Sequence, residues 1–273
     1  MPEWGRQLVF RALGSWSVEK LLLLGSLTWS LISKLPQRLW RIVLDAWHAV
    51  TGLLSWLASG LSGAGKTTFG TWLRTGLLGW LIWSGRVLLH VVELIGLGEI
   101  VQLAWGLIFR LRPLTAEERA ASASVHPANL IPYWQVRVDD DSCLIKIGVL
   151  LADLFRTKIA PGAITSMHIV HAPAAGLSMP LAVHELTHVA QYERVGAVYM
   201  LEALHAQGSA ADYDYGDLTA AWTAGIRFAD VTREQQASIC ADYYRVCRGR
   251  PAEFGATEAE LAPFIADMRS GRF

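Results

Sequence analysis

The chain has 273 residues, which is enough for one large domain or two small ones. Its 24 basic and 24 acidic residues cancel, so bulk attraction to phosphate gives no reason to expect a nucleic-acid partner. Hydrophobic residues make up 52% and charged residues 18%, which excludes a disordered chain and exceeds the apolar content of an ordinary soluble domain. Three cysteines do not form a disulfide framework, and we expect buried, reduced thiols at Cys143, Cys240 and Cys247.

The averages conceal two halves that differ in charge and in tryptophan. Residues 1–113 carry a net charge of +6 and ten of the twelve Trp, whereas residues 114–273 carry a net charge of −6. We therefore predict two domains, a Trp-rich apolar all-α domain over 1–113 and an α+β domain over 114–273. The segment 112–115 supplies the break, and Thr115 is expected to cap a new helix together with Glu118.

The first half indicates apolar helices that contact a membrane. Residues 46–65 contain no Asp, Glu, Lys or Arg, residues 75–98 are apolar but interrupted by three titratable side chains, and the run 21–33 is too short to span a bilayer unaided. The excess of positive charge and of Trp favours helices that cross or lie in a membrane. We expect contact with lipid through residues 1–113, in a bacterial inner membrane. A soluble helical bundle with a Trp-rich core is the alternative.

A phosphate-loop pattern also lies in this half. Gly60–Thr67 satisfies G-x-x-x-x-G-K-[ST], with Lys66 at the lysine position. A phosphate loop needs a buried strand before it and a helix after it. Residues 50–59 are typical of a helix instead, and no apolar strand ending in Asp follows to hold magnesium. We therefore expect a Gly/Ser turn between two apolar helices and no bound nucleotide.

The second half contains the metal-binding pattern H-E-x-x-H at His184, Glu185 and His188. Ser178 and the proline two residues later predict a helix start, and Gly196 predicts its end. On that helix the two histidines lie one turn apart on one face, so both imidazoles can reach one zinc ion. The Glu185 carboxylate can accept a proton from water at the metal.

A zinc site with two histidines needs a third protein ligand and an open position for water. The downstream candidates are Glu193, Glu202, His205, Asp212, Asp214, Asp217 and Glu234. We predict Glu234, because Thr232 and Gln235 form a capping box around it. Small residues three, four and seven positions further on would let this helix approach the first one closely.

Four pieces of sequence resemble one family: HELTHVAQY from His184, Tyr-Asp-Tyr from Tyr213, Phe228, and Glu-Gln-Gln-Ala from Glu234. They are similar to the bacterial Vgr-related proteins, which resemble the peptidase-like core domain associated with contractile injection systems. The resemblance covers about residues 114–250 and leaves residues 1–113 outside. It implies a zincin-like fold with Glu234 as the third ligand. Ala190 departs from the family, in which many relatives have Trp, and this difference concerns packing.

The segment before the motif helix is apolar and β-branched, so we predict a strand over residues 164–171. In zincin-like sites such a strand lies at the cleft edge and can pair with an extended peptide. His168 and His171 would face opposite ways on it, so they cannot both reach the metal, and we expect surface or cleft-wall histidines. Tyr213 and Tyr215 are candidates for a hydrogen bond to a tetrahedral oxyanion, and we choose Tyr213.

These patterns together predict a membrane-associated zinc metallopeptidase that acts on a peptide or protein substrate. Zinc-activated water would attack the peptide carbonyl, with His184, His188 and Glu234 as ligands and with Glu185 and Tyr213 as catalytic residues. The alternative is a membrane-inserting secretion-system effector or accessory protein whose metal site is structural.

Overall fold

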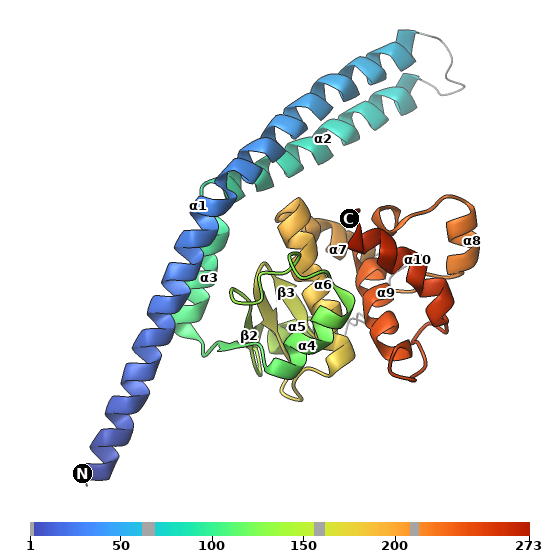
Figure 1. The fold of residues 1–273 in the computed structure, drawn as a ribbon. Coiled ribbons are helices and arrows are strands. Elements are labelled where there is room, and N and C mark those ends of the chain that lie inside the picture. The colour runs from blue at the N-terminus through green and yellow to red at the C-terminus, as the bar shows by residue number, and fades with distance from the viewer. Residues whose placement is uncertain (1–2, 62–68, 156–161, 208–212) are drawn as a thin grey trace. The chain divides into compact units, whose positions relative to one another are not determined.

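The computed structural model describes residues 3–61, 69–155, 162–207 and 213–273 (Figure 1). It contains two compact units, one formed by residues 1–23 with 102–273 and the other by residues 24–101. The composition boundary at residue 113 therefore lies inside the first unit.

Three helices make up the apolar N-terminal part. They are α1 (Glu3–Leu61), α2 (Phe69–Leu94) and α3 (Leu97–Ile108). The short apolar run at 21–33 is part of the long helix α1. Within the described residues, two helical stretches are long and apolar enough to cross a membrane, Lys20–Gly60 and Gly70–Leu94.

Tryptophan stacking joins α1 to α2. The rings of Trp56 and Trp72 lie 4.3 Å apart at 8°, and each indole N–H donates to the other residue's carbonyl oxygen at 3.1 Å. Gly60 and Gly76 make this contact possible, because a Cβ at either position would lie within 3 Å of the opposing indole. The helices on both sides of the phosphate-loop pattern agree with its sequence-based interpretation, while residues 62–68 themselves lie outside the described residues.

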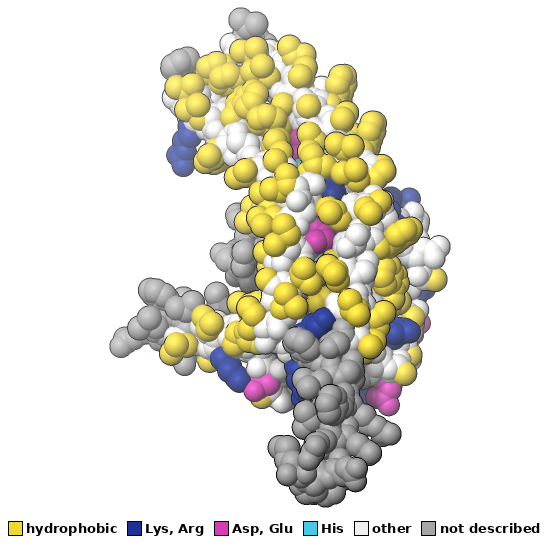
Figure 2. All heavy atoms as spheres, turned by 90° about the vertical axis from the view of Figure 1, so that its left-hand side faces the viewer, with side chains coloured by type: hydrophobic (Ala, Val, Ile, Leu, Met, Phe, Trp, Pro, Cys, Tyr) yellow, Lys and Arg dark blue, Asp and Glu magenta, His cyan; other side chains and the backbone are white. Residues whose placement is uncertain are grey.

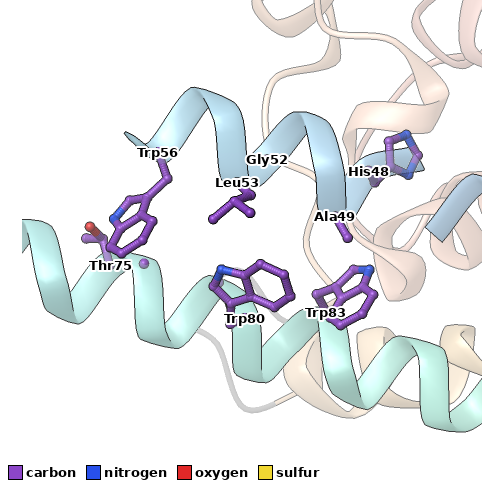
Figure 3. Close-up of a pocket in the computed structure, with 10 residues that line it drawn as sticks. His48, Ala49, Gly52, Leu53, Trp56, Thr75, Trp80 and Trp83 are labelled. Atoms are coloured by element: carbon purple, nitrogen blue, oxygen red, sulfur yellow. The ribbon is translucent and has the colours of Figure 1, made fainter. Parts of the chain in front are cut away.

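An apolar hollow of about 280 Å³ lies between the same two helices (Figure 3). Trp56 on α1 and Trp80 and Trp83 on α2 form its walls. Gly52 and Gly79 line it with no atom near the position of a Cβ. The hollow therefore results from glycines placed between large indoles.

Buried ion pairs hold α1 against α2 and α3 within residues 24–101. The guanidinium of Arg38 pairs with Glu99, and Asp45 lies 2.5 Å from His90. Between them, Arg41 Nη1 lies 3.1 Å from a carboxylate oxygen of Glu93. Among the described residues of this unit, Leu27 is the only hydrophobic side chain that is buried. Many large apolar side chains are exposed instead, as Figure 2 shows for one face.

The α+β part begins with a four-stranded mixed sheet. Its strands are β1 (Arg112–Pro113), β2 (Arg137–Asp139), β3 (Ile164–Ser166) and β4 (Ile169–His171), in the order β1-β2-β4-β3. Strands β2 and β4 are parallel and the other pairs are antiparallel. The α+β class predicted for this half is confirmed. The predicted break at 112–115 contains an edge strand.

One strand prediction is wrong. Residues 164–171 form a hairpin of two antiparallel strands, not a single strand. The chain reverses at Met167, whose φ of 56° is in the left-handed region that non-glycine residues rarely adopt. Its N–H is bound by the Tyr199 hydroxyl at 3.2 Å, which helps to hold this turn. The sequence contains no glycine at this turn to reveal it.

Seven α-helices and one short 3₁₀ helix complete the described residues of this part. They are α4 (Ala116–Val125), α5 (Cys143–Phe155), α6 (Met179–Val195), α7 (Val198–Gln207), α8 (Leu218–Thr223), η1 (Phe228–Asp230), α9 (Arg233–Val246) and α10 (Glu258–Arg269). The core lies where α6 packs against α4 and α9, around Val183, Leu186 and Ile239. The predicted capping box of Thr115 and Glu118 is confirmed.

The three cysteines lie in different environments. Cys240 is fully buried, and burial raises the pKa of its thiol to about 12. The expectation of burial is wrong for Cys247, which is exposed, and Cys143 is partly buried. Cys247 is the C-terminal cap of α9, so the seven-residue spacing from Cys240 does not place it on the packed face of the helix.

Candidate metal centre

Helix α6 presents two histidines to the same space. Its start and end are those predicted, since Ser178 accepts a hydrogen bond from the N–H of Leu181 and Gly196 caps the end with a φ of 75°. His184 and His188 lie one turn apart, with ring centroids separated by 5.0 Å. Both face α9, the helix that packs most extensively on α6.

Helix α9 brings a carboxylate to these histidines. Thr232 and Gln235 form the predicted capping box, which places Glu234 in the first turn. One oxygen of Glu234 lies 3.3 Å from His184 Nε2 and 3.4 Å from His188 Nε2. The three ligand atoms lie within 4.8 Å of one another. Two imidazole nitrogens and one carboxylate oxygen are the donor set of a catalytic zinc site.

At this centre a proton on His188 balances the negative charge of the Glu234 carboxylate. Burial opposes ionisation of Glu234, but the two histidines hold the pKa of its carboxyl well below the usual range. Burial likewise disfavours protonated His188, but the Glu234 carboxylate outweighs it and raises the pKa of His188 to about 9. Because a metal takes the unprotonated imidazole, binding at neutral pH would release a proton from this pair.

A buried amide chain fixes the orientation of His188. The Gln191 amide nitrogen donates to the carbonyl of Arg233 and to the Gln236 side-chain oxygen, both at 2.9 Å. The Gln236 amide nitrogen in turn donates to the carbonyl of Phe228 at 2.8 Å. Gln191 Oε1 therefore faces His188 Nδ1 at 2.8 Å and accepts a hydrogen bond from its N–H. This leaves His188 Nε2 as the nitrogen that turns toward Glu234.

Glu185 lies between the motif helix and the sheet. Its side chain is 3% exposed, and Thr165 Oγ1 on β3 donates to its carboxylate at 2.7 Å. The charge of Glu185 also contributes to the raised pKa of His188. The side chain is thus oriented by a hydroxyl.

The two candidate tyrosines have different surroundings. The Tyr213 ring is partly buried and lies 5.9 Å from the ring of His184, centroid to centroid. Tyr215 is buried and its hydroxyl donates to Asp242 at 2.7 Å. Tyr213 is therefore the one that lies beside the centre, as chosen from the sequence.

Sequence reasoning missed Tyr199 on α7. Its ring lies 6.1 Å from that of His188, and its hydroxyl donates to the Thr165 carbonyl at 2.7 Å while accepting the N–H of Met167. These two backbone groups lie along the outer edge of β3, which is the last strand of the sheet. Tyr199 therefore occupies the edge at which the sequence predicts pairing with a peptide. A tyrosine in an apolar helix gives no sequence signal for this role.

The remaining candidate ligands that the structure describes have other partners. These are Glu193 with His168 at 2.5 Å, Glu202 with Arg233 at 2.7 Å, Asp214 with the N–H of Gly216 at 2.8 Å, and Asp217 with the N–H of Ala220 at 2.9 Å. The side chain of His205 and the whole of Asp212 lie outside the described residues. Of the described candidates, Glu234 alone joins the two histidines.

The expectation of surface or cleft-wall histidines before the motif helix is wrong. His168 and His171 are 1% and 2% exposed, and each is hydrogen-bonded to a carboxylate. His168 packs against Tyr192 and His171 packs against Trp105.

Comparison of the chain with protein-family models, curated proteins and solved structures finds no match.

Proposed function

We propose that the α+β part is a zincin-like zinc metallopeptidase. The observation that carries the proposal is the meeting of His184, His188 and Glu234 within 4.8 Å, with Glu185 adjacent to the first histidine. Geometry and donor chemistry both suit zinc, which binds two imidazoles and a carboxylate and keeps one position open. The resemblance to Vgr-related proteins supports the same assignment.

Each residue has a defined task in this proposal. Zinc, when bound, lowers the pKa of water and polarises a carbonyl. Glu185 accepts the proton of the attacking water and passes it to the leaving amine, and Thr165 orients its carboxylate for both steps. Tyr213 donates a hydrogen bond to the oxyanion that forms from the peptide carbonyl.

The test combines metal analysis with one isosteric substitution. The full chain, purified in detergent without chelator, should contain about one zinc, and Glu185→Gln should retain it. Cleavage of a peptide library, followed by mass spectrometry, should fall by at least about 100-fold in Glu185→Gln. The exposed Glu258→Gln provides a matched control that should cleave normally. Absence of zinc, or equal cleavage by Glu185→Gln, would contradict the proposal.

We further propose that residues 24–101 insert into a bilayer. What supports this is their inverted arrangement, with charged pairs buried and with leucine and tryptophan outside. Lipid is the solvent in which such a surface is stable. Liposomes that contain brominated acyl chains should therefore quench tryptophan fluorescence of the full chain.

Two exposed tryptophans make this test specific. Trp47 on α1 is 64% exposed and Trp134, in the α+β part, is 52% exposed. Trp47→Phe should remove part of the quenching and Trp134→Phe should not. A full chain without any quenching would support the soluble helical bundle instead.

One observation favours the second candidate function, a membrane-inserting effector or accessory protein with a structural metal site. Tyr199 already occupies the Thr165 carbonyl and the Met167 N–H, so a peptide cannot add to β3 unless this tyrosine moves. In that case Glu185→Gln would leave every activity of the protein unchanged, whereas removal of the metal would unfold the α+β part.

A further inference from the structure

A serine, a histidine and an aspartate lie in line across three strands of the sheet. Ser166 Oγ on β3 is 2.7 Å from His171 Nε2 on β4, and His171 Nδ1 is 3.0 Å from Asp139 Oδ2 on β2. Successive residues of a strand face opposite sides. Thr165 contacts Glu185 on one side of β3, so the neighbouring Ser166 lies on the other side, away from the metal centre.

The hydrogen bonds determine where the protons are. The same oxygen of Asp139 accepts from the Ser142 hydroxyl at 2.6 Å and from the Trp105 indole N–H at 2.9 Å. The carboxylate held by these donors also accepts a hydrogen bond from the Nδ1–H of His171. His171 Nε2 is then an acceptor, and the Ser166 hydroxyl donates to it. This is the tautomer that a histidine needs in order to take a proton from a serine.

The burial of the three residues follows the same order. Asp139 and His171 are 3% and 2% exposed, whereas Ser166 is partly exposed. The Trp105 ring packs edge-on against His171, at 5.1 Å between centroids, and keeps water from this pair. Burial lowers the pKa of His171, and Asp139 opposes this only in part, so the imidazole is neutral near pH 7.

We propose that Ser166, His171 and Asp139 form a second, metal-independent site in which Ser166 is an activated nucleophile for acyl transfer from esters. Ser166 Oγ attacks the ester carbonyl carbon while its proton passes to His171 Nε2. The bond to the alkoxide then breaks, and His171 returns the proton to the leaving alcohol. Water repeats the sequence on the acyl-serine, which releases the acid and restores the hydroxyl.

A fluorophosphonate probe tests this site directly on the full chain. Ser166 Oγ should displace fluoride from phosphorus, and peptide mapping should locate the adduct on Ser166. Labelling should persist in Glu185→Gln and in the presence of a zinc chelator, so the result does not depend on the proposed peptidase. It should vanish in Ser166→Ala and slow at least about 100-fold in His171→Gln. Failure to label Ser166, or equal labelling in His171→Gln, overturns the proposal.

A second variant keeps the test decisive if His171→Gln does not fold. The thiol introduced by Ser166→Cys should be activated by His171 and should react with iodoacetamide at least about 10-fold faster than the exposed thiol of Cys247. The two thiols are measured in one sample, so Cys247 is an internal control. A slower or equal rate at position 166 overturns the proposal.

Discussion

In the described residues of 24–101 the buried side chains are mostly polar or charged and many large apolar ones are exposed, whereas in residues 114–273 a continuous apolar core lies inside. The first arrangement leaves no hydrophobic driving force for folding in water, since the apolar surface stays exposed. Its helices are joined instead by the Arg38–Glu99 ion pair, the Asp45–His90 hydrogen bond and indole contacts. The second arrangement has the apolar interior that burial from water favours. The difference supports the proposal that residues 24–101 insert into a bilayer.

The largest effect that we expect concerns the polar centre of the α+β part. Glu234→Ala removes the proposed ligand that comes from a second helix and should weaken zinc affinity by several orders of magnitude, about as much as loss of a motif histidine. Competition with a chelator of known affinity measures this.

Asp214→Ala is the matched control, because this carboxylate accepts a hydrogen bond from the N–H of Gly216 within its own turn. It should lower stability slightly and retain zinc. The assignment of Glu234 would be wrong if Glu234→Ala kept full occupancy under the chelator while another candidate lost it.

The buried pairs of residues 24–101 test whether polar contacts hold the helices of this region together. Glu99→Met leaves the Arg38 guanidinium buried without this partner, which should cost about 3–5 kcal/mol. The double variant Arg38→Met with Glu99→Met should regain most of it. Denaturant titration of helix content in detergent measures both. If Glu99→Met alone were neutral, the ion pairs would not be what holds these helices.

The sequence predicts local features well and tertiary partners poorly. The helix of the metal motif could be delimited because Ser178 and Gly196 act on their own neighbours. Glu234 could be selected from the capping box around it. The pairing of Arg38 with Glu99 could not, because 61 residues separate them and charges inside apolar runs count only as interruptions.

A left-handed turn at a residue other than glycine is also hard to predict from the sequence. The hairpin at Met167 depends on a left-handed turn that the Tyr199 hydroxyl helps to hold from another helix. The same contact explains why the edge of β3 is occupied. Neither the turn nor the occupied edge has a pattern that a single sequence displays.

A pH dependence of stability should belong to the apolar core of the α+β part. His126 is buried between Ser122 and Thr187, and burial lowers its pKa from 6.5 to about 4. Between these pH values the unfolded chain binds the proton and the folded chain does not. Stability should therefore fall as the pH drops from 6.5 to 4, by about 3 kcal/mol in total. Urea unfolding of metal-free protein at several pH values measures this loss.

The comparison variant for this prediction is His126→Gln, which cannot titrate. Its stability should depend less on pH than that of the unmodified chain between pH 6.5 and 4, and the two curves should run parallel above that range. Identical curves throughout would show that His126 does not contribute.

The smallest effect that we expect concerns the orientation of a single ligand. Gln191→Met keeps the volume of the side chain but removes the acceptor for His188 Nδ1 and both donors toward α9. Zinc affinity should fall about 10- to 100-fold, because the imidazole is no longer fixed in its binding tautomer. Nitrogen NMR shifts of His188 distinguish this from a merely structural loss, since they report the tautomer directly.

Gln236→Met should produce a weaker form of the same change, because it leaves the Gln191 amide in place but lets it rotate. If Gln191→Met lowered stability while the tautomer and the zinc affinity stayed the same, the amide chain would join α6 to α9 without orienting the metal ligand.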